Sequence, residues 1–190
     1  ANAYATGRTY GEVPNAYAVA GARGVDQFAT GRDGGAIASL TNNSSGSITA
    51  SANAFASGGF QDGYFSYGYP CADAMGGVQA CANATGADQF ATVTGSATGK
   101  AEATVTNSGS INAIAFAGAS GTYVSGIAEA ETWGVLQSAK SSRGEASAEV
   151  ENSGTIYAYT NARARSSASA RINAEAHGVD QKVWGYTDAL

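Results

Sequence analysis

Small apolar residues occupy every second position over long stretches of this chain. In the segment 156–164 one phase holds, in order, Ile156, Ala158, Thr160, Ala162 and Ala164. The other phase holds larger or polar residues such as Tyr157 and Arg163. A period of two is typical of a β-strand, whose side chains point alternately to two faces. Alanine is a weak strand former, so its repeated use on one face predicts a thin inner core that admits only small side chains.

The stretch from Asn152 to Gln181, NSGTIYAYTNARARSSASARINAEAHGVDQ, recurs in weaker form from Asn107 and again from Asn43. It contains two short motifs, Asn-Ser-Gly and Gly-Val-x-Gln. Both are typical of corners between strands, because Gly tolerates positive φ and Asn can bond its own backbone. The predicted corners of the repeat are Gly24, Gly46, Gly86, Gly109, Gly134, Gly154 and Gly178.

The spacing of these corners predicts the size of the repeat. The Asn-Ser-Gly corner at Gly109 recurs at Gly154, and the Gly-Val-x-Gln corner at Gly134 recurs at Gly178. Gly154 divides the span from Gly134 to Gly178 into two nearly equal parts. These halves predict a coil of about 20 to 24 residues, within the range of solenoid repeats. The predicted fold is therefore all-β, a parallel β-solenoid (β-helix) in a single domain over residues 1–190, with one loop insertion.

The insertion lies where the regular pattern stops. The stretch from Gly46 to Gly86 exceeds the equivalent stretch from Gly154 to Gly178 by about 16 residues. We predict an inserted loop over residues 59–81, and insertions in repeat proteins often lie on the contact face. Its aromatic residues form the candidate contact surface: Phe60, Tyr64, Phe65, Tyr67 and Tyr69.

Cys71 and Cys81 are the two cysteines of the chain, and both lie in this predicted loop. A disulfide between them would close a short loop and add on the order of 2 to 3 kcal/mol of stability. Free buried thiols and an intermolecular bridge are the alternatives. A metal site at these cysteines is not expected, because the chain has one histidine and no second cysteine pair at zinc spacing.

The pattern NSGxIxAxAxA followed by AxAxGVxQ resembles the repetitive passenger regions of bacterial autotransporter-like and related large surface adhesins. The resemblance covers residues 16–181 apart from the insertion. It implies a parallel β-helix outside the cell, either secreted or exposed on a bacterial cell surface.

Charge and hydropathy exclude several kinds of partner. Charged residues make up 13% of the chain and the net charge is −5, which does not fit a nucleic-acid-binding surface. The basic residues Arg163, Arg165 and Arg171 are expected to pair with glutamates such as Glu149 one coil away. No apolar run reaches the roughly 18 residues of a membrane span. The N-terminal residues lack a signal-peptide profile, so we expect a removed signal or a piece of a longer chain.

Candidate chemistry is sparse. His177 and Asp180 suggest a dyad, but no nucleophile motif accompanies them. The pairs Glu129/Glu131 and Glu149/Glu151 suggest a glycosidase pair or a calcium site, but they follow the polar phase of strands and no calcium-binding repeat is present. We therefore expect no catalytic residues, no metal and no cofactor.

The predicted function is an extracellular structural or adhesive fibre element that associates with itself end to end. The alternative is a surface module that binds a glycan or a host or cell-surface protein through the aromatic insertion. Outward aromatics fit either a contact surface or packing beneath the insertion, and their rows comprise Tyr4, Tyr17, Phe55, Phe116, Tyr157 and Tyr159. A polysaccharide-active enzyme and an ice-binding protein are weaker alternatives, since the latter needs regular threonine rows.

Overall fold

The computed structural model describes residues 2–11, 16–32, 34–58, 78–94, 99–121 and 125–185. Within these ranges the chain is almost entirely strand and contains no helix. The strands are β1 (Asn2–Gly11), β2 (Ala16–Gly31), β3 (Ala36–Asn42), β4 (Ser47–Gly58), β5 (Val78–Val93), β6 (Ala101–Asn107), β7 (Ser110–Gly121), β8 (Gly126–Ser141), β9 (Ala146–Asn152), β10 (Thr155–Ser166) and β11 (Ala170–Trp184). The prediction of an all-β protein is confirmed.

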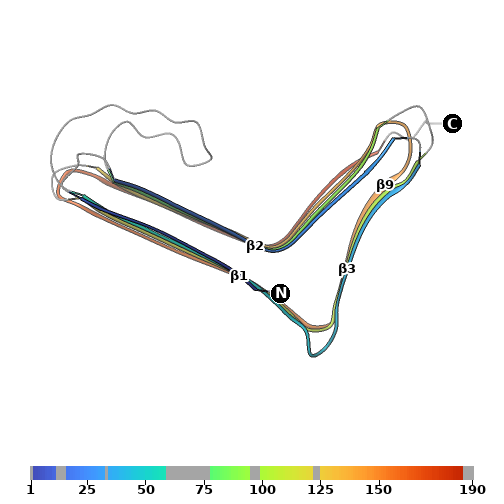
Figure 1. The fold of residues 1–190 in the computed structure, drawn as a ribbon, viewed down its shortest axis with the longest axis horizontal. Helices are drawn as coiled ribbons and strands as arrows, with labels where there is room; N and C mark the ends of the chain where they lie inside the picture. Colours follow the sequence, from blue (N-terminus) through green and yellow to red (C-terminus); the bar gives the residue numbers. More distant parts are fainter. Residues whose placement is uncertain are drawn as a thin grey trace.

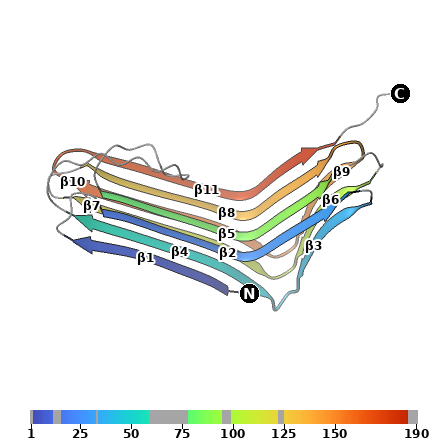
Figure 2. The same cartoon turned by 45° about the horizontal axis from the view of Figure 1, so that its top comes forward.

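Every third strand along the chain lies in the same sheet. Sheet A has the order β1-β4-β7-β10, sheet B the order β2-β5-β8-β11, and sheet C the order β3-β6-β9. All neighbouring strands are parallel and in register. The chain thus passes through sheets A, B and C in turn, and each new circuit lies on the previous one (Figures 1 and 2).

The predicted length of a coil is wrong. Asn107 and Asn152 are register partners on adjacent strands, and they are separated by 45 positions in the sequence. Gln137 and Gln181, also register partners, are separated by 44 positions. One circuit therefore takes about twice the predicted length, because the two similar halves of the repeat form different sheets of one circuit.

The connection that interrupts the regular pattern joins β4 to β5. β4 ends at Gly58 and β5 begins at Val78, so this connection is residues 59–77. Cys81, which the predicted loop included, belongs to the strand, because the alternating pattern of β5 already starts at Val78. The connection itself lies outside the described residues.

The alternating residues form the core, as the period of two predicted. Along β7 and β6 every second residue is buried. Alanines fill the space between sheet A and the first halves of the sheet B strands. A second group of small residues lies between the second halves of these strands and sheet C, and a third, which contains Ile48, Val105 and Ile111, lies between the two. The inner space is narrow, because most inner positions hold alanine.

The sheet B strands bend at a glycine and continue, so each of them faces sheet A first and sheet C afterwards (Figure 1). The bends carry Gly24, Gly86, Gly134 and Gly178 inside β2, β5, β8 and β11. The prediction that these glycines end strands is therefore wrong. Gly46, Gly109 and Gly154 lie at corners between strands, where sheet C passes into sheet A.

The physical reason for these glycines also differs from the prediction, because none of the seven has a backbone with positive φ. At Gly24, Gly86 and Gly134 the close approach of the next circuit requires glycine instead, and at the corners Gly109 and Gly154 the close approach of the previous circuit does so. A Cβ on Gly86 would lie 2.5 Å from Ile111 Cγ2 and 2.6 Å from the Gly134 carbonyl oxygen. Such distances are too short for a carbon atom. The next circuit can therefore stack on the bend only when the residue at the bend is glycine.

Two buried rows of amide side chains connect the circuits. In the first row, the Nε2 of Gln181 donates to Gln137 Oε1 (2.7 Å), Gln137 to Gln89 (2.8 Å) and Gln89 to Gln27 (2.7 Å). In the second row, Asn42 Nδ2 donates to Asn107 Oδ1 and Asn107 Nδ2 to Asn152 Oδ1, both at 2.7 Å. Gln89, Gln137 and Asn107 are completely buried. These ladders satisfy polar groups that would otherwise be costly in a small apolar core.

Candidate functional site

The sites predicted in the insertion lie mostly outside the described residues. Phe60, Tyr64, Phe65, Tyr67 and Tyr69 fall within the connection 59–77, so the predicted contact surface stays a prediction. Cys71 also falls there, whereas Cys81 is buried on β5 with 1% of its surface exposed. The disulfide between the two cysteines therefore stays a prediction.

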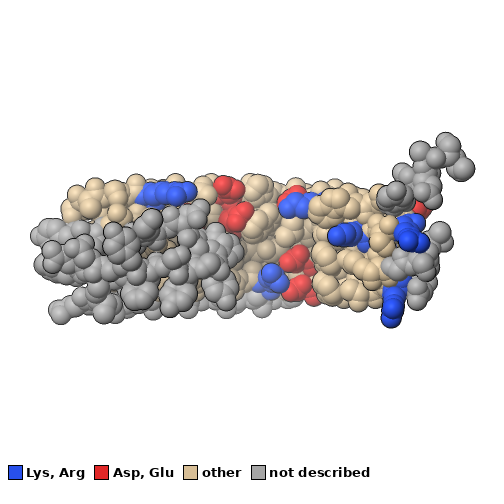
Figure 3. Space-filling view, turned by 90° about the horizontal axis from the view of Figure 1, so that it is seen from above, with Lys and Arg blue, Asp and Glu red and all other residues tan. Residues whose placement is uncertain are grey.

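The outer side of sheet B carries the best-defined charged groups of the described chain. Because its strands bend, this side faces the inside of the V in Figure 1. Figure 3, which looks onto it, shows acidic and basic side chains in small separate groups. In two of these groups, one on β2 and β5 and one on β8 and β11, two carboxylates from adjacent strands lie opposite each other.

The first group joins Asp26 and Asp88, which are register partners on β2 and β5. Arg23 lies between them, with Nη1 2.9 Å from Asp26 Oδ2 and Nε 3.5 Å from Asp88 Oδ2. The pKa of Asp88 is nevertheless raised, chiefly by burial and further by Asp26, while Arg23 opposes the shift. We interpret the group as structural, because the positive charge of Arg23 offsets part of the negative charge of the two aspartates.

Replacing Asp88 with Asn is expected to stabilise the protein slightly at neutral pH. The raised pKa means that folding disfavours the ionised carboxylate, so this carboxylate costs stability once the pH exceeds its pKa in the unfolded chain. The gain should be largest at neutral pH and should shrink toward zero as the pH falls below about 4, where the carboxyl becomes protonated in both states. Urea unfolding of both proteins across this pH range measures it. A variant that is less stable at pH 7 would contradict the prediction.

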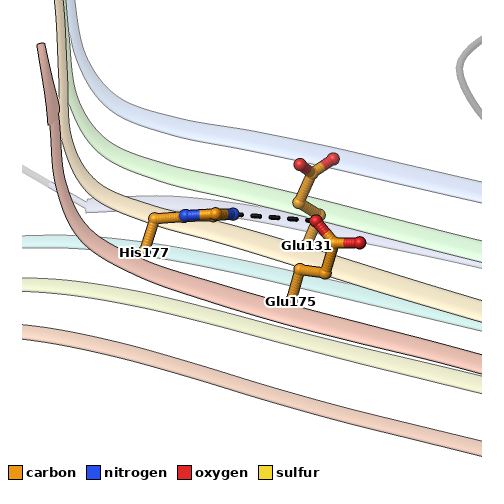
Figure 4. A group of neighbouring side chains, drawn as sticks. All are labelled: Glu131, Glu175 and His177. Carbon is orange, nitrogen blue, oxygen red and sulfur yellow. Dashed lines mark ion pairs between the residues drawn. The ribbon is translucent and has the colours of Figure 1, made fainter.

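The second group contains Glu131 on β8 and Glu175 and His177 on β11 (Figure 4). One ligand-type atom from each residue lies within 4.8 Å of the others. Glu131 and Glu175 are register partners, and His177 Nε2 lies 3.7 Å from Glu175 Oε2. The pKa of Glu131 is raised, first by burial and then by the charge of Glu175, with a smaller opposing effect of His177. Like charges placed directly opposite each other destabilise a sheet unless a cation lies near.

Neighbouring side chains hold this second group in place. Asn173 Nδ2 donates to Glu175 Oε1 at 3.2 Å, which leaves Oε2 on the side of His177. The His177 ring stacks on Trp133, with ring centroids 6.0 Å apart and ring planes 14° apart. The sequence pattern missed this group, because its members become neighbours only through the stacking of whole circuits.

The other candidate carboxylate pairs each lie along one strand, Glu129 and Glu131 on β8 in sheet B and Glu149 and Glu151 on β9 in sheet C. Glu149 and Arg171 lie in different sheets, so the predicted pairing of charges across coils is wrong for these two residues. Among the described residues, Asp180 pairs with Lys182 at 3.6 Å and His177 with Glu175.

A surface hollow of about 440 Å³ lies near the far end of the sheet A strands. Arg163, Arg165 and Phe55 line it, and the Phe55 ring lies over Gly118 of the adjacent strand. Outward aromatics form short contacts nearby: the rings of Tyr157 and Tyr159 stack at 6.2 Å, and those of Phe116 and Tyr159 lie 5.6 Å apart. Tyr157, Tyr159 and Phe55 are partly exposed, which fits a contact surface.

At β11, the edge strand of sheet B, inner side chains are partly exposed in the described structure. Ile172, Val179 and Val183 are in the inward phase of β11 yet 54%, 44% and 46% exposed. A Cβ added to Gly178 would meet no atom within 4 Å, unlike one at Gly24, Gly86 or Gly134. This edge therefore has the side-chain pattern of an inner circuit, but no strand of the described chain stacks on it.

Comparison with protein-family models, with curated proteins and with solved structures found no match. In the described part of the chain, no helix has the length and apolar character that a membrane crossing needs.

Proposed function

We propose that the chain is a parallel β-solenoid that serves as a structural or adhesive fibre element outside the cell, secreted or on a bacterial cell surface. The uncovered β11 edge carries the proposal, because it presents apolar inner side chains beside a bend glycine. Parallel backbone ladders and buried amide rows run the length of the stack and would give a fibre stiffness along its axis.

The two ends of the stack are complementary in their hydrogen bonding. In the inner circuits, a glutamine Nε2 donates to the glutamine of the previous circuit and to backbone carbonyls of sheet C. Among the described residues, Gln27 Nε2 donates only to the Ser39 carbonyl oxygen, at 2.9 Å. At the other end, Gln181 Oε1 accepts no bond from a described residue. Gln27 of a second copy, placed above β11, would complete this row.

The proposed joint is therefore a head-to-tail contact between copies of this chain. It places β1 and β2 of one copy on β10 and β11 of another, with Gly24 over Gly178 and Gln27 over Gln181. Sheets A and B carry the joint, since each has four strands and sheet C has three. The contact would cover Ile172, Val179 and Val183 in the way that inner circuits cover their equivalents.

Replacing Gly178 with Ala is expected to weaken this assembly without unfolding the protein. The added Cβ meets nothing in the isolated chain, whereas a Cβ at the equivalent inner position Gly134 would lie 2.5 Å from the Gly178 carbonyl oxygen. Overpacking of this kind costs about 1 to 3 kcal/mol, which weakens association by more than about fivefold. Sedimentation velocity and electron microscopy over a range of concentrations measure the effect.

Gly21→Ala is the matched control, because Gly21 lies in the outward phase of β2, between the buried Ala20 and Ala22, and no atom lies within 4 Å of an added Cβ. We expect the parent and Gly21→Ala to form rods that lengthen with concentration, and Gly178→Ala to stay short. Short rods of one length for all three proteins would contradict head-to-tail assembly. In that case the edge would be covered by another part of a longer polypeptide.

A second candidate function is binding of an acidic glycan or of a protein, supported by the hollow beside Phe55. Arg163 and Arg165 supply positive charge there, and β4, which carries Phe55, leads directly into the aromatic connection 59–77. Binding of sulfated or carboxylated oligosaccharides to the parent protein and to an Arg163→Ala, Arg165→Ala double variant tests it. Equal binding by the two proteins would remove the hollow as the site.

A further inference from the structure

We propose that Glu131, Glu175 and His177 bind one divalent transition-metal ion, of which Zn²⁺ is the clearest example. Two carboxylate oxygens and one imidazole nitrogen form a ligand set that Zn²⁺ accepts in proteins. The proposal is independent of fibre formation, since all three residues belong to one chain. The metal would connect β8 to β11, the last strand of sheet B.

The geometry brings the three donors together from two adjacent strands. Their donor atoms lie within 4.8 Å of one another, and Figure 4 shows the side chains of Glu175 and His177 meeting beside Glu131. Ligand bonds to Zn²⁺ of about 2.0 to 2.2 Å need donors roughly 3.3 Å apart. Rotation of the partly exposed Glu175 and His177 side chains is sufficient for this closure, because their side chains are 52% and 44% exposed. Water would complete the coordination.

Comparison with the other acidic pair on this sheet indicates why a cation fits here. Asp26 and Asp88 also oppose each other on adjacent strands, and Arg23 bridges them. For Glu131 and Glu175, no ion pair with Lys or Arg occurs among the described residues; Lys182 opposes the raised pKa of Glu131 less than His177 does, and His177 is a cation only when protonated. A bound divalent ion would offset both carboxylate charges with the imidazole neutral.

Two neighbours would act as supports for the ligands. Asn173 holds one oxygen of Glu175, and Trp133 fixes the plane of the His177 ring by stacking. Such outer contacts orient metal ligands in known sites, and their loss commonly weakens binding about 10- to 100-fold. Here they position two of the three donors before any ion arrives.

Zinc titration of the untagged protein tests the proposal directly. His177 is the single histidine of the chain, so imidazole nitrogen NMR reports on this residue alone. We expect its signals to shift with Zn²⁺ and calorimetry to give one ion per chain. Glu131→Gln and Glu175→Gln should each weaken binding by more than about tenfold, as loss of a ligand exceeds loss of an outer contact. His177→Phe, which retains a ring against Trp133, should abolish binding.

Glu129→Gln is the matched control, because Glu129 lies on the same strand and face but outside the group. Its affinity should stay close to that of the parent, because the charge of Glu129 affects Glu131 less than those of Glu175 and His177 do. Circular dichroism checks that every variant is folded. Unmoved His177 signals at millimolar Zn²⁺ would overturn the proposal. Unchanged affinity in both glutamine variants would also overturn it, as would one ion per two chains, which would indicate an intermolecular contact.

Discussion

Replacing Gln137 with Met is expected to lower the free energy of unfolding by about 3 to 5 kcal/mol, since each buried polar atom left unpaired costs about 1 to 3 kcal/mol. Gln137 is completely buried in the middle of the glutamine row. Its amide donates to Gln89 Oε1 and to the carbonyl oxygens of Ala103 and Glu149, and its Oε1 accepts from Gln181. Methionine fills a similar volume but can replace none of these bonds.

The same substitution at the end of the row is the control. Gln181 is exposed and its amide donates to Gln137 at 2.7 Å, so Gln181→Met should cost about 1 kcal/mol or less. Urea unfolding of dilute protein, monitored by circular dichroism, gives both values. Equal losses at the two positions would mean that burial of Gln137 adds little to the stability that its hydrogen bonds provide. Our account of the ladder would then be wrong.

Replacing Gly86 with Ala is expected to destabilise the protein by about 3 kcal/mol or more, at the upper end of overpacking effects. The added Cβ would lie 2.5 Å from Ile111 Cγ2 and 2.6 Å from the Gly134 carbonyl oxygen. The second of these atoms belongs to the backbone of the next circuit, so relief requires a shift of the stacked strands. Thermal and urea unfolding measure the loss.

Gly21→Ala again provides the comparison within one sheet. Its added Cβ meets no atom within 4 Å, so the variant should keep or slightly exceed the stability of the parent. A similar loss for Gly21→Ala and Gly86→Ala would contradict close stacking as the reason for the bend glycines, because no atom lies close to an added Cβ at Gly21. A large loss confined to Gly86→Ala would support close stacking as the reason for the bend glycines.

Both predictions concern the contacts that hold one circuit on the next. The glutamine row and the glycine row run along the stack, and both stop at β11 with one partner missing among the described residues. Under the proposed head-to-tail joint, Gln27 and Gly24 of a second copy would continue both rows over β11.

Residue patterns predicted the strands and the inner faces because both depend on near neighbours in the chain. The alternation of Ala113, Ala115 and Ala117 with larger residues is enough to indicate a strand with one buried face, and β7 shows it. The same alternation, resuming at Val78, marks where β5 begins.

The corner motifs were harder to interpret, because two different uses of glycine look alike in the sequence. Gly154 marks a turn between sheets, whereas Gly134 marks a bend inside a continuous strand. The two similar spacings from Gly134 to Gly154 and from Gly154 to Gly178 therefore looked like two coils when they are parts of one. Recurrence of Asn and Gln at 44 to 48 residues was a usable signal of the full circuit.

Local alternation was thus sufficient to predict the β-strand character, the small-residue core and the point where the regular pattern stops. The length of a circuit, the two amide ladders and the meeting of Glu131, Glu175 and His177 emerged only in the folded stack. These features depend on which strands become neighbours, and register between strands 44 to 65 residues apart is set by packing across the whole stack.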